Sequence, residues 1–128
     1  MTGLPHRHPK DGWPVLAFAS QEELLAWLDE HHADAAGAWF AMAKKGRGLA
    51  SVTLEEVTEA LMAVGWVDSK GQRLDDDYWA VRAHVRRPRS PWSESNKRRV
   101  EKLTAEGRMR PSGQAQVDAA VADGRWGT

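Results

Sequence analysis

The sequence predicts a single α+β domain, in which about four helices pack with a small, mostly antiparallel sheet of about three strands. Three observations lead to this prediction. Capping-box patterns precede two segments with helical periodicity, one run is apolar on both alternations, and a later segment alternates between apolar and basic residues. The chain has 128 residues, of which 41% are hydrophobic, so it can bury one core without staples.

The beginning of the chain is polar and contains Pro5, Pro9 and Gly12. We therefore expect a flexible arm over residues 1–14, followed by one domain over residues 15–128. No run reaches the ~18 apolar residues of a membrane span, and the first residues lack a signal-peptide pattern, which predicts a cytoplasmic protein. The chain has no cysteine, which excludes disulfides and thiolate chemistry.

Two helices are predicted from the residues that precede them. Ser20 and Thr53 are each followed three positions later by a glutamate, which is the capping-box pattern. Apolar residues at helical spacing come after both. We expect one helix over about 21–31 and another from residue 54 until Gly65 stops it.

The strands are predicted from alternation. The run Ala38–Lys44 is apolar on both alternations, which is typical of a central strand with two covered faces, so Trp39 and Phe40 should pack in opposite layers of the core. Segments Trp66–Asp68 and Tyr78–Arg86 flank residues rich in turn formers and so predict a hairpin. Alternation in the second segment puts three potential cations on one face, spaced about 7 Å apart: Arg82, His84 and Arg86.

Two more helices are predicted in the last third of the chain. Ser93 can cap the first, which should run through Glu106 to Gly107 and point Asn96 toward its apolar side. Pro111 suits the first turn of the second, which Gly124 should stop. Val117, Ala120 and Val121 should face inward on this second helix. Trp126 should dock after its end.

Several segments resemble the YdeI/OmpD-associated family, also called bacteriocin-protection proteins. In family order they are LLAWLDEHH, AWFAMAKKG, ALMAVGWVDSKGQRLDDDY, RRPRSPWSESN and EGRMRPSGQAQVDAA with DGRW. The resemblance covers nearly the whole chain from Val15; Ala83 and Val85 stand where the family commonly has an aromatic residue and a proline. It implies a cytosolic bacterial protein linked to tolerance of cationic antimicrobial peptides or bacteriocins, with no defined biochemical activity.

A basic segment over residues 82–99 contains seven Lys or Arg and one acid, in a chain whose formal net charge is zero. We expect Arg82, Arg86 and Arg87 to bind a small anion, because guanidinium groups hydrogen-bond phosphate or carboxylate bidentately. Ser90 and Ser93 would supply hydrogen bonds, and Trp66 and Trp92 would form the walls of the pocket. Asn96 and Asp68 would orient the site.

Three alternatives stay open. The arginines can instead pair with Asp68 and the aspartates at 75–77, fastening the hairpin. Single-stranded nucleic acid can bind to basic residues 97–99 with tryptophans, although the pI of about 7.0 weighs against it. Basic protein or peptide partners can bind acidic helix faces, whose residues are Glu22, Glu23, Glu55, Glu56 and Glu59.

We predict no catalytic residue, no cofactor and no metal site. Ser90 or Ser93 with His84 offers the residue types of a hydrolase, but the sequence lacks the GxSxG elbow. The histidine pairs at 6/8 and 31/32 lack the spacing of a recognised metal site and the nearby carboxylates that would complete its ligands. The sequence therefore predicts a non-catalytic protein that binds a small anion in a pocket lined by arginine and tryptophan.

Overall fold

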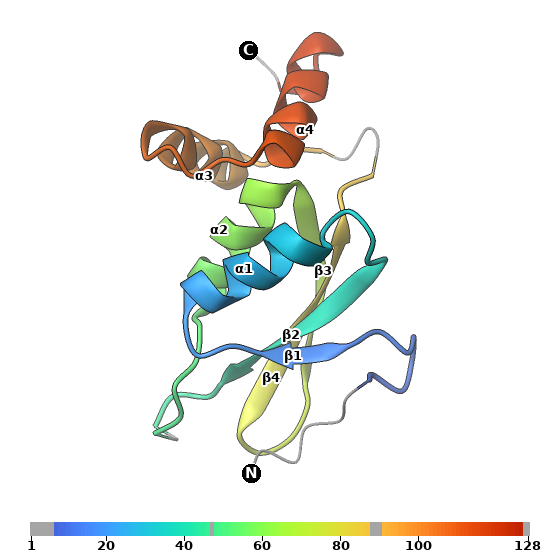
Figure 1. The fold of residues 1–128 in the computed structure, drawn as a ribbon, viewed down its shortest axis with the longest axis vertical. Coiled ribbons are helices and arrows are strands. Elements are labelled where there is room, and N and C mark those ends of the chain that lie inside the picture. Colours follow the sequence, from blue (N-terminus) through green and yellow to red (C-terminus); the bar gives the residue numbers. More distant parts are fainter. Residues whose placement is uncertain (1–6, 47, 88–90, 127–128) are drawn as a thin grey trace.

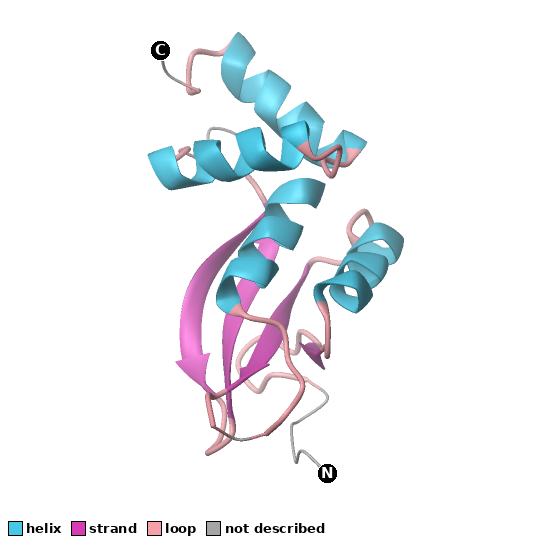
Figure 2. Cartoon of the chain, turned by 90° about the vertical axis from the view of Figure 1, so that its left-hand side faces the viewer, coloured by secondary structure: helices cyan, strands magenta, loops and turns pink. Residues whose placement is uncertain are grey.

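The computed structural model describes residues 7–46, 48–87 and 91–126. Within these ranges four strands form one mixed sheet and four helices accompany it, which confirms the α+β class. Helices α1 (Gln21–His31) and α2 (Leu54–Val64) cover one face of the sheet (Figure 1). Helices α3 (Glu94–Ala105) and α4 (Pro111–Ala122) lie beyond one end of the sheet, next to α2 (Figure 2). None of these four helices has the length and hydrophobicity of a membrane span.

The strands lie in the order β1-β2-β4-β3, where β1 is Val15–Ala17, β2 is Gly37–Ala43, β3 is Trp66–Arg73 and β4 is Tyr78–Val85. The two β3–β4 and β2–β4 pairs are antiparallel, whereas β1 pairs with β2 in parallel. The sheet therefore has one strand more than predicted. A three-residue strand is too short to show an alternation, and its partner lies beyond α1 in the sequence.

The central position of β2 agrees with its apolar character on both alternations. Phe40 faces the main core, which fills the space between the sheet and helices α1 and α2. Trp39 faces the other way and packs with Tyr78 and Trp13 on the face opposite those helices, called here the outer face. The predicted division of Trp39 and Phe40 between two layers is confirmed.

The helix starts follow the predicted caps. The side chains of Ser20, Thr53 and Ser93 each accept a hydrogen bond from the backbone amide three positions later. At Thr53 the capping box is complete, because the Glu56 carboxylate also accepts from the Thr53 amide. Gly65 ends α2 with φ at +85°, a left-handed conformation that favours glycine.

A second cluster, called here the C-terminal cluster, joins α3 and α4 to the Met62 and Ala63 side of α2. Trp126 docks against Trp92 at a centroid distance of 5.0 Å, as predicted. The inward placement of Val121 was wrong, because α4 buries a narrow stripe and leaves Val121 57% exposed. Residues in that stripe are Gly113, Val117 and Ala120.

Candidate functional site

The segment before β1 forms a tight turn on the outer face of the sheet. The His8 amide donates to the Trp13 carbonyl over 2.9 Å, and Gly12, with φ at +73°, closes the turn by donating to the His8 carbonyl. His8 is 2% exposed and stacks on Trp39 with ring centroids 4.0 Å apart. Residues 7–14 of the expected flexible arm are thus packed on the sheet, and residues 1–6 lie outside the described residues.

Asp11 connects this turn to two strands. Its Oδ1 accepts from the Trp13 amide over 3.0 Å, which is an Asx turn. The Trp39 indole donates to both carboxylate oxygens over 3.2 and 3.1 Å, and Arg82 Nε donates to Oδ2 over 3.0 Å. Burial alone would raise the pKa of the Asp11 carboxyl, but the hydrogen bonds from Trp13, Arg82 and Trp39 lower it overall. The carboxylate is therefore held in its charged form by donors from three parts of the chain.

Arg82 lies between Asp11 and an aromatic ring. Its guanidinium carbon is 4.0 Å from the centroid of the Trp13 ring, in cation–π geometry. The hydrogen bond to Asp11 uses Nε, and no hydrogen bond joins the two Nη groups to another residue in the described ranges. The guanidinium of Arg82 is thus oriented by Asp11 and Trp13, and its Nη groups can donate to a further acceptor.

Gly37 makes room for the Trp13 ring. A Cβ at this position would lie 2.2 Å from Trp13 Cζ3 and 2.6 Å from the Ala83 carbonyl oxygen. Only glycine allows the ring to approach β2 so closely. The position of Arg82 over the Trp13 ring therefore depends on the absence of a side chain at Gly37, the first residue of β2.

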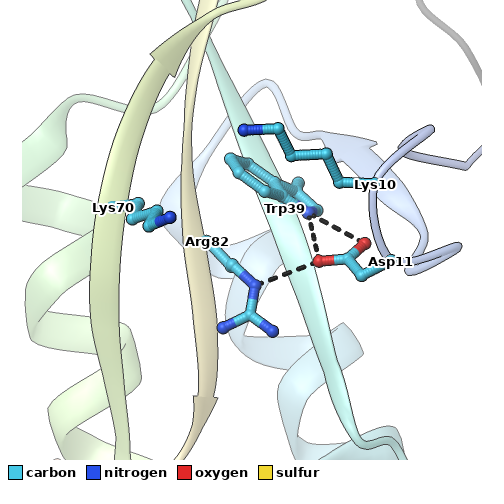
Figure 3. Close-up of a pocket in the computed structure, with 5 residues that line it drawn as sticks. All are labelled: Lys10, Asp11, Trp39, Lys70 and Arg82. Atoms are coloured by element: carbon cyan, nitrogen blue, oxygen red, sulfur yellow. Dashed lines mark hydrogen bonds and ion pairs between the residues drawn. The ribbon is translucent and has the colours of Figure 1, made fainter.

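These residues border a hollow of about 340 Å³, called here the basic pocket, which is lined by Lys10, Asp11, Trp39, Lys70 and Arg82 (Figure 3). Lys10 comes from the turn, Lys70 from β3 and Arg82 from β4. In the described part of the chain neither lysine has an ion-pair partner, whereas Asp11 is hydrogen-bonded on both oxygens. The pocket thus holds three cations and one carboxylate that already has donors.

The predicted arginine site is divided between two places. Arg82 points into the basic pocket, whereas Arg86 is 3% exposed and stacks on Trp92 at 3.9 Å. Arg86 Nη1 donates to the Pro91 carbonyl, and its amide donates to the Gly65 carbonyl. Burial lowers the pKa of Arg86, as does the nearby positive charge of Arg125. Arg86 lies just beyond the last residue of β4, and its guanidinium packs on Trp92 rather than beside Arg82.

The other predicted site residues do not assemble around one pocket. Trp66 is 1% exposed and belongs to the main core, where its indole donates to the His32 carbonyl, so it cannot be a pocket wall. Asp68 is exposed on β3, and Arg87 is exposed after β4. Ser93 caps α3, and its hydroxyl already binds the backbone there. Asn96 accepts from Arg99, and Ser90 lies outside the described residues.

The expected hairpin pairing takes a different form in the structure. Arg82 pairs with Asp11 rather than with the aspartates at 75–77. Arg73 pairs with Asp76, and Asp75 caps the turn by accepting from the amides of residues 77 and 78. The hairpin therefore closes with its own local contacts.

The acidic face predicted on α2 is engaged within the fold. Glu55 accepts two hydrogen bonds of 2.9 Å from Arg99, which lower its pKa. Glu59 is buried and pairs with Lys102 and Arg108; burial would raise its pKa, but the hydrogen bonds lower it overall. These contacts leave less acidic surface for a basic partner than the sequence suggests. They also occupy Arg99, one of the three basic residues assigned to nucleic acid.

The basic pocket contains four residues that the sequence analysis did not place in a site: Lys10, Asp11, Trp39 and Lys70. Lys10 and Asp11 were assigned to a flexible arm, and Trp39 to the core. Lys70 lies opposite Arg82 in the β3–β4 pairing, after a shift of register between Asp68 and Lys70. The Asp–Gly sequence before Trp13 signals a turn, but nothing in it indicates which strand the turn covers.

No group of three or more His, Asp or Glu side chains in the described ranges is arranged to hold a metal ion. No curated protein and no solved structure matched this chain in comparisons of sequence and fold. Residues 16–116 match the model of a protein family described as a domain of unknown function, DUF8412. Because this match spans well over half of the sequence, the chain belongs to the DUF8412 family.

Proposed function

We propose that this protein is a non-catalytic binding protein for a small phosphate- or carboxylate-containing anion, and that the basic pocket is its binding site. One observation carries the proposal: three cationic side chains from three segments line one hollow whose only carboxylate already has donors. Arg82 supplies Nη donors in a fixed orientation, and Lys10 and Lys70 supply point charges. Of the three arginines predicted to bind the anion, this proposal retains Arg82. The other two positive charges come from Lys10 and Lys70 instead of Arg86 and Arg87.

The charge of the pocket favours a ligand with two negative charges. Asp11 offsets the charge of Arg82, with which it is paired at 3.0 Å. Lys10 and Lys70 remain without an ion-pair partner among the described residues. A phosphate monoester or a dicarboxylate matches these two charges, and we expect a monocarboxylate to bind more weakly.

The double variant Lys10→Gln/Lys70→Gln tests this proposal. Both lysines are exposed, so the variant should fold, and we expect it to bind phosphate esters or dicarboxylates at least about tenfold more weakly. The measurement is a thermal-shift screen of small anions at two salt concentrations, followed by calorimetric titration of the anions that raise the melting temperature.

Lys44→Gln/Lys45→Gln is the matched control, because it removes the same charge from the loop after β2. It should bind the anion as the parent chain does. Equal weakening in both double variants would show that only net charge matters, and the basic pocket would then not be the site. Full binding by Lys10→Gln/Lys70→Gln would also contradict the proposal.

We place this activity in the bacterial cytosol and connect it with tolerance of cationic antimicrobial peptides or bacteriocins. This part of the proposal is supported by the resemblance to the YdeI/OmpD-associated family in the segments given above. The Lys10→Gln/Lys70→Gln variant tests whether anion binding in the basic pocket is required for peptide tolerance. If anion binding underlies tolerance, expression of the parent chain should protect a sensitive strain better than expression of this variant.

A further inference from the structure

We propose a second binding site, independent of the basic pocket, that accepts a medium-chain alkyl carboxylate. It is a groove of about 370 Å³ near the end of β2, called here the loop groove. Its apolar walls include Met42, Val52, Leu54 and Trp79, and Lys44 and Lys45 also line it. Trp79 and Met42 come from adjacent strands, in direct register across the β2–β4 pair.

The walls of the loop groove are fixed by the fold. Met42 and Val52 are buried members of the main core, and Trp79 packs against that core from β4. Ser51 holds the returning chain in place, because its hydroxyl accepts from the Ala43 amide over 2.9 Å and donates to the Val52 carbonyl over 3.0 Å. Leu54 is the first residue of α2. The groove is thus bounded by a strand pair and a helix start.

Apolar surface is left exposed at this groove. Leu49 and Leu54 are each 43% exposed, and both line it. They are two of the four large apolar side chains that remain exposed in the described ranges. Scattered exposed leucines need no explanation, but two that border one hollow beside a partly buried tryptophan indicate an apolar ligand.

The charge at the groove favours an anionic head group. Neither Lys44 nor Lys45 has an ion-pair partner within the described ranges. The carboxylates in the first turn of α2 neither line the groove nor pair with these lysines, since Glu55 binds Arg99 and Glu56 accepts from the Thr53 amide. A carboxylate can therefore lie beside the lysines while its alkyl chain covers the apolar walls.

The size of the groove limits the occupant. Ligand pockets span about 300–1000 Å³, and this groove is near the lower end of that range. One alkyl chain fits such a space better than a two-chain lipid. Each methylene that enters the groove should lower the Kd about two- to fourfold, which gives an affinity series that a purely electrostatic site would not show.

Calorimetric titration of the full chain with hexanoate, octanoate and decanoate, each below its micellar concentration, tests the proposal. We expect the Kd to fall with chain length and decanoate to bind more tightly than decyltrimethylammonium, which has a similar chain and the opposite charge. Leu54→Ser should weaken decanoate about three- to tenfold. Lys44→Gln/Lys45→Gln should reduce the preference for decanoate over the cation.

The controls separate this site from the rest of the surface. Val121→Ser removes an apolar side chain on α4 that is more exposed than Leu54, and Lys10→Gln/Lys70→Gln removes two charges from the basic pocket. Both should keep the chain-length dependence of the parent chain and its decanoate-induced shift of the Trp79 indole resonance, because these two readouts report on the loop groove and not on carboxylate binding in the basic pocket. If Leu54→Ser does not fold, a decanoate-induced shift of the Trp79 indole resonance in the parent chain replaces it.

Four outcomes would overturn the proposal. They are the absence of saturable binding, equal affinity for decanoate and the cation, equal weakening by Val121→Ser, and an unshifted Trp79 indole resonance. Binding of an acidic amphipathic peptide at the groove, without binding of the alkyl series, would assign this surface to a protein partner instead.

Discussion

Asp11 joins a turn and two strands through a single carboxylate. Its donors come from Trp13 in the turn, Trp39 on β2 and Arg82 on β4. Removing the charge would leave partly buried donors without an acceptor of equal strength, and a hydrogen bond to a charged group is worth about 1.5–3 kcal/mol. The side chain therefore stabilises the turn as well as orienting the basic pocket.

We predict that Asp11→Asn lowers the free energy of unfolding at pH 7 by about 1–3 kcal/mol. The side-chain NH₂ of asparagine is itself a donor, and it would face donors that now bind the carboxylate. The folded-state pKa of Asp11 lies below its ordinary value of about 3.9, so its contribution is complete above that pH and is lost as pH falls through the folded value. Urea unfolding at pH 7 and pH 3 measures both effects.

In this experiment the difference between parent and Asp11→Asn should shrink on going from pH 7 to pH 3. Some acid sensitivity should remain in the variant, because the pKa values of Glu55 and Glu59 are also lowered by folding. Asp118→Asn, an exposed change on α4, is the control and should leave the unfolding free energy nearly unaltered. A constant difference between pH 7 and pH 3 would contradict the assigned role of the Asp11 charge.

The site residues could be predicted from the sequence only where the signal was local. Arg82 was identified because strand alternation placed it on a polar face. Asp11 was missed because its partners Trp39 and Arg82 lie 28 and 71 positions away, and nothing near Asp11 encodes that pairing. Arg86 was misplaced because its guanidinium, just beyond the end of β4, packs on Trp92 rather than beside Arg82.

At the level of the elements, the crossing of α4 over α2 depends on Gly113. A Cβ there would lie 2.2 Å from the Ala63 carbonyl oxygen and 2.9 Å from that of Met62. The approach is reinforced by Ser112, whose hydroxyl donates to the Val64 carbonyl over 2.8 Å. Since the obstacles are backbone atoms, they cannot move aside as a flexible side chain would.

We predict that Gly113→Ala destabilises the protein, although alanine is better than glycine by about 1 kcal/mol in an unhindered helix. The overlap should cost about 1–3 kcal/mol or more, which outweighs that gain. Chemical denaturation gives the sign directly. Ala115→Gly, on the exposed side of the same helix, should cost about 0.5–1 kcal/mol from propensity alone. An increase in stability for Gly113→Ala would mean that α4 does not touch α2 at this point.

Helix starts were the most predictable elements, because a cap and its amide partner lie within one turn. The Ser20, Thr53 and Ser93 caps all formed. Strand β1 was not predictable, since three residues carry no periodicity and the parallel partner is separated by a whole helix. Local chemistry thus predicts where helices begin, whereas the edge of the sheet is decided by packing between distant segments.

At the scale of the whole molecule, α2 belongs to both apolar clusters. Val57, Leu61 and Val64 contribute to the main core, while Met62 and Ala63 contribute to the C-terminal cluster. With almost all of its later residues buried, α2 cannot be stable unless both neighbours are in place. We therefore expect the sheet and the α3–α4 pair to unfold together.

Leu103→Ala tests this coupling. Leu103 is buried on α3, so truncation should cost about 2–5 kcal/mol. Under cooperative unfolding, the amide exchange of Phe40 on β2 should accelerate together with that of α3, although Phe40 lies outside the C-terminal cluster. The exposed change Val121→Ala should have little effect on either. Faster exchange confined to α3 and α4 would show two independent units.

The seven tryptophans are distributed so that individual residues mark different parts of the molecule. Trp39 lies at the basic pocket, Trp79 at the loop groove, and Trp92 and Trp126 contact each other in the C-terminal cluster. Because indole emission depends on local polarity and on neighbouring charges, replacing one tryptophan at a time by phenylalanine would assign the spectral change at each place. The chain thus carries intrinsic optical probes at both proposed sites, and occupancy of each can be followed without attaching a dye.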